Sequence, residues 1–267
     1  AKGIDVLKTA EGQLSYERHE TARETTAHHL LSTPRGGQYS ITLPDGSRVW
    51  LNAASSLKYP VVFGHKERVV ELEGEGFFEI ATFYEQVPGS GNGSPASEGN
   101  TAKKIPFIVK LRDGATVEVI GTKFNIMAYG GEAEIRTTLL EGRVRVEKER
   151  LTSEERVLHT SAEPEPGGQV LIKADGDINL LEKVNTDEAI AWKNGQFKFV
   201  NASIESIMRQ VERWYDAEIK YEGKIDYHFN ATIYRNEPLN KLLKLLEKTQ
   251  RVKFAVEGRR ITVSPRM

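Results

Sequence analysis

The N-terminal part of the chain alternates between apolar and polar residues with a period of two. Residues 39–43 alternate in this way, residues 44–47 contain an Asp-Gly pair, and the alternation resumes over residues 48–51. Alternation on both sides of Asp-Gly is typical of a β-hairpin, because the turn between the strands needs residues that tolerate a left-handed backbone. The pattern therefore predicts a hairpin at this point.

The same pattern continues much further along the chain. Alternating runs occupy residues 68–72, 77–81, 106–111, 115–120, 124–129, 133–137 and 143–147. Short strands separated by closely spaced turns are typical of β-sandwiches and related stacked-sheet folds. We therefore expect an all-β, sandwich-like or stacked-sheet domain over residues 34–185.

Near Trp192 the pattern changes to one that contains helices. Apolar positions recur with helical spacing in two stretches, 204–215 and 239–246. Alternating runs lie around them, at residues 196–200, 217–221, 229–234, 252–256 and 260–263. The order predicts a small α+β domain of type βαββαββ over residues 190–267, so the chain as a whole is expected to be mainly β.

Two polar stretches do not fit either pattern. Residues 1–33 lack sustained periodicity and are interpreted as a tether with one short strand at most. Residues 88–104 are rich in Gly, Pro and Ser, which predicts a flexible loop within the β domain. The glycines at 89, 91 and 93 precede no helix, whereas a phosphate-binding loop needs the N-terminus of one.

Composition narrows the function classes. Lys plus Arg (37) nearly cancels Asp plus Glu (38), so the chain has no broad basic surface for nucleic acid. It has no cysteine, which excludes disulfides, thiolate metal sites and cysteine nucleophiles. No apolar stretch approaches the roughly 20 residues of a spanning helix. We expect a soluble piece of a longer protein, with any membrane anchor before Ala1.

Residue types associated with catalysis are present but do not form a recognisable site. Asp45-Gly46-Ser47 and Asp113-Gly114-Ala115 resemble the loops of aspartic proteases only loosely, because Gly follows Asp directly, and both lie where hairpin turns are expected. No histidine has the spacing of a metal site on a helix. The six histidines are His19, His28, His29, His65, His159 and His228. We therefore expect a protein that is not an enzyme and that binds no cofactor or metal.

A glycan-binding or glycan-cleaving β-domain remains the alternative function class. Glu71, Glu73, Glu75 and Glu79 lie close together in the sequence and could include a glycosidase pair. Several aromatic residues could line a sugar-binding face, although strand aromatics are more often part of the core. These aromatic residues are Trp50, Tyr59, Phe63, Phe77 and Phe78.

Several segments, taken in order, resemble one family. Residues 43–60 closely match the opening of the FecR domain of ferric-citrate-regulator-type anti-sigma factors, and residues 69–79 resemble its next segment, with Gly76 where Ala is usual. Residues 106–109, 119–126 and 138–144 continue the match. The segments at 191–199, 207–215 and 239–246 are similar to the C-terminal domain attached to FecR domains in Bacteroidetes. The loop 88–104 departs from the family pattern.

The resemblance implies a function that composition does not. Such proteins are anti-sigma factors that cross the inner membrane once and carry signals by protein–protein binding during nutrient uptake. They hold an extracytoplasmic-function sigma factor on the cytoplasmic side. On the periplasmic side they contact the N-terminal signalling domain of an outer-membrane TonB-dependent transporter. The chain would then be the periplasmic part, with residues 1–33 as a periplasmic tether and the sigma-binding segment outside it. Whether it restrains or activates the sigma factor, and whether the signal is an iron chelate or a glycan, stays open.

The C-terminal domain resembles the fold of the transporter's signalling domain, which suggests that two sheets pair edge to edge. Exposed strand edges are ready-made surfaces for such pairing. We expect the edges at residues 196–200 and 227–233 to bind the partner. The residues assigned to this site are Phe197, Phe199, Phe229, Ala231 and Ile233.

The Gly121–Thr122 peptide is the second site that the resemblance implies. Some relatives cleave a Gly-Thr bond in themselves, by attack of a hydroxyl on the preceding carbonyl. The alternative is a tight turn that joins the strands at 115–120 and 124–129, in which Gly121 supplies a special backbone angle.

Overall fold

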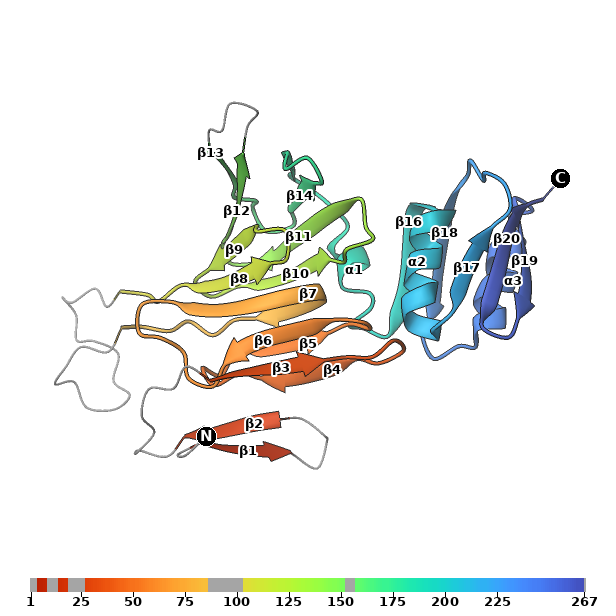
Figure 1. Cartoon of the computed structure of the whole chain (residues 1–267). Helices are drawn as coiled ribbons and strands as arrows, with labels where there is room; N and C mark the ends of the chain where they lie inside the picture. The colour runs from red at the N-terminus through yellow and green to blue at the C-terminus, as the bar shows by residue number, and fades with distance from the viewer. Residues whose placement is uncertain (1–3, 9–13, 19–26, 86–102, 152–156, 267) are drawn as a thin grey trace. The chain divides into compact units, whose positions relative to one another are not determined.

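The computed structural model describes residues 4–8, 14–18, 27–85, 103–151 and 157–266 (Figure 1). Contacts divide the chain into two compact units. Unit 1 comprises Ala1–Ser32, Tyr39–Leu51 and Ser56–Val184, and unit 2 comprises Thr33–Gln38, Asn52–Ser55 and Asn185–Met267. The predicted loop 88–104, including the glycines at 89, 91 and 93, lies outside the described residues except for its last two. The domain limits 34–185 and 190–267 stay a proposal.

Unit 1 consists of β-strands, and the mainly β fold class is confirmed. Its strands are β1 (Ile4–Lys8), β2 (Leu14–Arg18), β3 (His28–Ser32), β4 (Tyr39–Thr42), β5 (Arg48–Leu51), β6 (Ser56–Pro60), β7 (Arg68–Glu79), β8 (Phe107–Leu111), β9 (Thr116–Val119), β10 (Lys123–Ala128), β11 (Glu134–Glu141), β12 (Val144–Leu151), β13 (Val157–Ala162), β14 (Gln169–Lys173) and β15 (Ile178–Leu181). The expectation of at most one short strand in residues 1–33 is wrong, because three of these strands, β1 to β3, lie there. The expected hairpin is formed by β4 and β5.

The long strand β7 belongs to two sheets. Its first half pairs with β6 and β8, and its second half pairs with β5 and β10. Gly74, with φ of +89°, lies at the change-over, where a left-handed residue lets the strand bend. One sheet then has the order β1-β2-β4-β5-β7-β10-β11-β14-β15, and the other has the order β3-β6-β7-β8-β9-β12-β13.

The core of unit 1 lies between these two sheets. Alternate residues of each strand point inward, so Val49, Leu72 and Val117 are all buried although they come from different strands. Phe78 and Phe124 stack within this core with their ring centroids 4.9 Å apart. Burying each side chain of this size stabilises the fold by about 1.5–3 kcal/mol.

Unit 2 has the predicted βαββαββ order, preceded by one short helix. Its elements are α1 (Thr186–Ala189), β16 (Gln196–Ser203), α2 (Ile204–Tyr215), β17 (Glu218–Tyr221), β18 (His228–Tyr234), α3 (Leu239–Glu247), β19 (Val252–Glu257) and β20 (Arg260–Pro265). Ser203 caps α2 by accepting a hydrogen bond from Ser206 N at 3.2 Å. Strands β16 and β18 form one sheet, and β17, β20 and β19 form another.

Candidate functional site

The side chains predicted to bind a partner lie mostly inside unit 2. Phe197, Phe199 and Phe229 are at most 2% exposed, Ile233 is 9% exposed, and Ala231 is half-buried. Successive strand residues point to opposite faces, and these five lie on the inner face of β16 and β18. A partner that approaches this sheet would therefore meet its backbone edge or its outer face.

The hydrogen-bond pattern identifies which backbone groups face outward. Arg235 N donates to Gly195 O at 2.8 Å, so the pair that these two residues form is a hydrogen-bonded one. Bonded and unbonded pairs alternate along an antiparallel ladder. The register partners Lys198 and Thr232 fall on an unbonded pair. Their backbone N–H and C=O groups therefore point away from the neighbouring strand. Those of Lys198 face the outer edge of β16, and those of Thr232 face the outer edge of β18.

The β16 edge is partly occupied. Gln196 N donates to Ala191 O at 2.9 Å, and Gln196 O accepts a hydrogen bond from Arg235 Nε at 3.3 Å. The ammonium of Lys198 lies 3.6 Å from the carboxylate of Asp187 in α1. The backbone groups of Gln196, at the start of this edge, are therefore already used.

The β18 edge is open over a longer stretch. His228, Asn230, Thr232 and Tyr234 are all exposed, and β18 pairs only with β16 in the part of the chain that the structure describes. Tyr234, the last residue of β18, is 59% exposed and adds apolar surface at this strand. An extended segment could therefore pair here through its main chain.

Another edge of unit 2 is protected. Phe254 N, on the outer side of β19, donates to Glu247 Oε1 of α3 at 3.0 Å. A side-chain acceptor of this kind satisfies an edge N–H and discourages pairing with a further strand. Among these edges the β18 edge is therefore the best candidate for partner binding.

The Gly121–Thr122 peptide lies where the chain passes from β9 to β10, and so from one sheet of unit 1 to the other. The predicted special backbone angle is absent, because Gly121 is not left-handed. A side chain at Gly121 would instead collide with Thr82 Oγ1. The close approach of Thr82, rather than a backbone angle, explains the glycine.

The hydroxyl and carbonyl of Thr122 are both hydrogen-bonded to backbone groups. Its hydroxyl donates to Arg143 O at 2.8 Å, and its carbonyl accepts a hydrogen bond from Ile80 N at 3.0 Å. Gly142, with φ of +90°, packs against the Gly121 carbonyl. A backbone carbonyl cannot take the hydroxyl proton, so this arrangement favours a structural corner.

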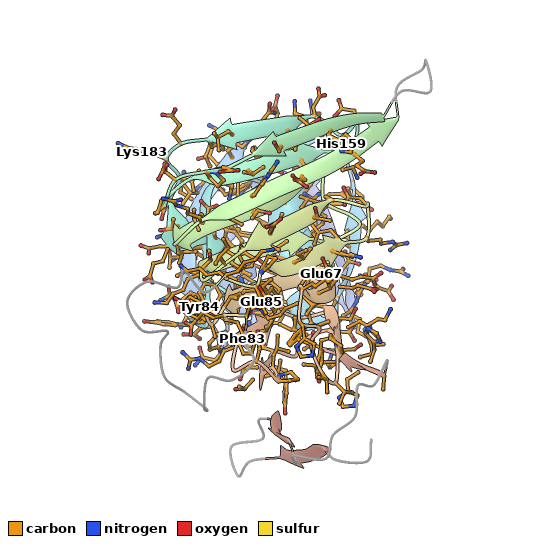
Figure 2. The ribbon with its side chains drawn as sticks, turned by 90° about the vertical axis from the view of Figure 1, so that its left-hand side faces the viewer. Glu67, Phe83, Tyr84, Glu85, His159 and Lys183 are labelled. Atoms are coloured by element: carbon orange, nitrogen blue, oxygen red, sulfur yellow. The ribbon has the colours of Figure 1, made fainter. Side chains whose placement is uncertain are left out.

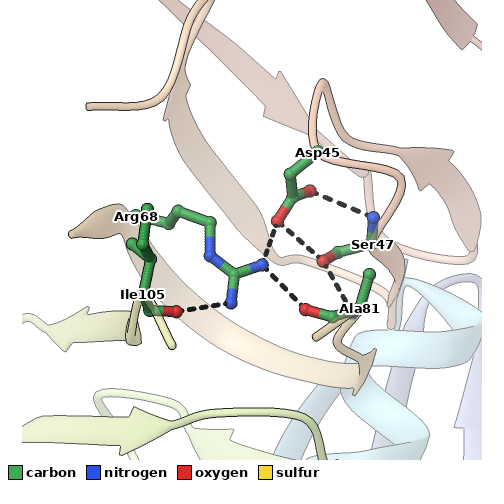
Figure 3. Close-up of polar contacts among 5 residues, drawn as sticks. All are labelled: Asp45, Ser47, Arg68, Ala81 and Ile105. Atoms are coloured by element: carbon green, nitrogen blue, oxygen red, sulfur yellow. Dashed lines mark hydrogen bonds and ion pairs between the residues drawn. The ribbon is translucent and has the colours of Figure 1, made fainter. Parts of the chain in front are cut away.

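A buried ion pair that the sequence did not single out holds the β4–β5 turn in place (Figure 3). Arg68 Nη1 lies 2.6 Å from Asp45 Oδ2, and both side chains are at most 2% exposed. Asp45 also accepts hydrogen bonds from the Ser47 backbone and hydroxyl. Arg68 donates further to Ala81 O at 2.9 Å and to Ile105 O at 3.0 Å. The Asp-Gly turn is confirmed, and its Asp has this second role.

The outer face of unit 1 carries a row of alternating charges. Arg48, Glu79, Lys123 and Glu141 are register partners on β5, β7, β10 and β11. Arg48 pairs with Glu79, and Lys123 Nζ lies 2.8 Å from Glu141. The hydrogen bond that Lys123 donates to Glu141, together with the charge of that carboxylate, raises the pKa of Lys123. Exposed pairs of this kind contribute little to stability.

Three of the four acidic residues considered for glycan chemistry, Glu71, Glu75 and Glu79, have separate partners. Glu71 pairs with Lys58 at 2.9 Å, and Glu75 accepts a hydrogen bond from Asn125 at 3.1 Å. Glu75 and Glu79 are four residues apart on one strand, roughly 13 Å. This exceeds the separation of a glycosidase pair.

The aromatic residues considered for a sugar-binding face are largely core residues. Tyr59, Phe77 and Phe78 are at most 3% exposed. Trp50 is half-buried and packs edge-on against Phe77. They therefore leave little aromatic surface on which a sugar could stack.

The remaining acidic and histidine side chains of the described residues were considered as metal ligands. Figure 2 shows Glu67 and Glu85 well apart from His159. Among the described residues, no group of three or more His, Asp or Glu side chains could hold a metal ion. In the same residues, no helix is long and apolar enough to cross a membrane.

Comparisons with known proteins give matches in both units. The family described as "FecR protein" matches residues 29–145, and that described as "FecR, C-terminal" matches residues 196–263. A 1.65 Å crystal structure of a "putative anti-sigma factor" from Parabacteroides distasonis is 27% identical, with a TM-score of 0.68, over 88% of this chain and 98% of that chain. A 2.50 Å structure with the same description is 26% identical, with a TM-score of 0.69, over 90% and 99%. No curated protein matches the chain.

Proposed function

We propose a function from one premise: this chain belongs to the FecR family, because it contains both a FecR region and a FecR C-terminal region. The solved structures, which it matches over nearly their whole length, each carry the description "putative anti-sigma factor". We assign the same role to this chain. It acts by binding proteins rather than by catalysis, as the anti-sigma role requires.

In this role the chain is the periplasmic part of a protein that crosses the inner membrane once. It receives a signal from the N-terminal signalling domain of an outer-membrane TonB-dependent transporter. The signal passes to an extracytoplasmic-function sigma factor through a cytoplasmic segment that lies outside this chain. Family membership supports this arrangement.

The open β18 edge is the observation that supports a specific binding mode. We assign transporter binding to strand addition at this edge, centred on the outward-facing backbone of Thr232. Main-chain hydrogen bonds would supply affinity, and the exposed side chains of Asn230 and Tyr234 would contact the outer face of the added strand. The inner-face residues Phe197 and Phe229 contribute by holding β16 and β18 in position.

A proline at Thr232 tests this assignment. Proline has no N–H, and its ring blocks the approach of a strand, but the Thr232 N–H faces away from β16 and its loss breaks no ladder bond. We expect Thr232→Pro to weaken binding of the N-terminal signalling domain of the partner TonB-dependent transporter by at least about tenfold, or about 1.4 kcal/mol. Isothermal titration calorimetry measures the change.

The matched control is Lys198→Pro, because Lys198 is the register partner of Thr232 on the opposite edge. This variant should fold and bind like the unaltered chain. Loss of binding with Lys198→Pro alone would move the site to the β16 edge. Full binding by both folded variants would show that strand addition at this sheet is wrong.

Self-cleavage at Gly121–Thr122 has its own test. Because the Thr122 hydroxyl is bonded to Arg143 O, we expect the purified chain to remain intact through prolonged incubation at neutral pH. Intact-mass spectrometry of the unaltered chain and of Thr122→Ala should give one species for each. Two fragments that meet after Gly121, present only when Thr122 is unaltered, would establish cleavage instead.

A further inference from the structure

The side-chain oxygen of Asn52 is a buried hydrogen-bond hub within unit 2. Oδ1 accepts hydrogen bonds from Ala53 N at 2.9 Å, from Gln38 Nε2 at 3.2 Å and from Arg235 Nη1 at 2.8 Å. Asn52 is 5% exposed, so these bonds form away from water. Hydrogen bonds to a charged donor are worth more than neutral ones, which makes the Arg235 bond the strongest of the three.

The loop Asn52–Ser55 that carries this hub is held in a strained shape. Ala54 has φ of +55°, a left-handed backbone that is unfavourable for a residue with a side chain. Thr33 holds the loop on both sides: its hydroxyl donates to Asn52 O at 2.6 Å and accepts a hydrogen bond from Ser55 N at 3.0 Å. The strain persists only while such contacts determine the conformation.

Arg235 joins this loop to the candidate binding edge. It follows directly after Tyr234, the last residue of β18, and its backbone N–H continues the β16–β18 ladder. Its guanidinium carbon lies 4.6 Å from the ring centroid of Phe197 and 4.8 Å from that of Trp214, and the residue is 6% exposed. Trp214 Nε1 also donates to Arg235 O at 2.9 Å. Two rings and the backbone thus fix the cation that reaches Asn52.

We propose that Arg235 and Asn52 form a coupling contact, through which a displacement of β18 changes the conformation of the loop Asn52–Ser55. The rings of Phe197 and Trp214 and the backbone of β18 hold the Arg235 guanidinium in place. A shift of β18 therefore moves the guanidinium and alters its 2.8 Å hydrogen bond to Asn52. The loop connects β5 to β6 along the chain, so the change reaches both strands covalently. Displacement of β18 by a partner rests on the proposed function. The coupling between β18 and the loop does not, because it is a property of the chain alone.

Hydrogen–deuterium exchange on the whole chain tests the coupling without a partner. Asn52→Ala removes the acceptor and should speed exchange of the β18 amides roughly tenfold or more, as well as those of the loop. Arg235→Met should have the reciprocal effect on the amides of Ala53 and Ala54. Reciprocity is required of any coupling between two sites.

Two further variants distinguish coupling from a general loss of structure. Asn52→Asp keeps an oxygen acceptor for Arg235 and should restore slow exchange in β18. Arg260→Met, at an exposed arginine of β20, is the matched control and should leave both segments unchanged. If Asn52→Ala speeds exchange only in residues 52–55, the proposal is wrong, whatever the calorimetry with the transporter domain shows.

Discussion

Replacing Arg68 by methionine is expected to lower the free energy of unfolding of unit 1 by about 3–5 kcal/mol. The substitution leaves Asp45 buried with its strongest partner removed, since the pair is 2.6 Å apart and almost fully shielded from water. It also frees the carbonyls of Ala81 and Ile105. Urea denaturation followed by circular dichroism measures the loss.

The double variant Asp45→Asn with Arg68→Met separates the ion pair from simple packing. If an uncompensated charge causes the loss, removing both charges should recover a large part of it. Lys58→Met, which breaks the exposed pair with Glu71, is the matched control and should change stability by less than about 1 kcal/mol. A loss below 1 kcal/mol with Arg68→Met would contradict the structural role of the pair.

The sequence predicted the strands well but not the importance of Arg68. Its place in an alternating run follows from residues 68–72 alone. Its burial depends on Asp45, which lies 23 positions earlier and was identified only as a turn residue. A local pattern contains no information about a partner on a different strand. A charged residue at the start of an apolar strand was the available signal.

Which segments of the chain belong to unit 2 could not be predicted for the same reason. Arg235 and Asn52 are 183 positions apart, and the segments 33–38 and 52–55 cluster with the C-terminal residues. The helices and strands of unit 2, by contrast, follow from periodicity within each segment. Alternation and helical stripes specify which elements form, whereas long-range polar contacts arise only once the elements have packed.

The candidate binding residues show a further limit of pattern reasoning. The resemblance to the transporter's signalling domain led to an assignment of Phe197, Phe229 and Ile233, which the structure places in the core. Strand pairing uses main-chain groups, so the informative positions are the alternate, polar ones. Thr232 and Lys198 have no distinctive side chains for this purpose, and only the ladder register identifies their outward-facing backbone.

Gly142, rather than Gly121, is expected to be the sensitive glycine at the corner of unit 1. Gly142→Ala should cost about 3 kcal/mol, because it places a side chain on a left-handed backbone and crowds a packed site. The new Cβ would lie 2.5 Å from Gly121 O and 3.0 Å from Thr122 Cα. Both are backbone atoms, which cannot move without displacing the chain.

Gly121→Ala is the informative comparison for this prediction. The atoms nearest its new Cβ belong to Thr82, and the closest is the side-chain Oγ1, so we expect a smaller loss, of about 1 kcal/mol, from a rotated Thr82. Thr82→Ala should then rescue Gly121→Ala. No side-chain truncation should rescue Gly142→Ala, because the backbone carbonyl of Gly121 remains in place. Urea denaturation of Gly121→Ala and Gly142→Ala, each with and without Thr82→Ala, measures both effects. Equal losses for the two glycines, or rescue of Gly142→Ala by Thr82→Ala, would show that the corner is not packed around the Gly121 carbonyl.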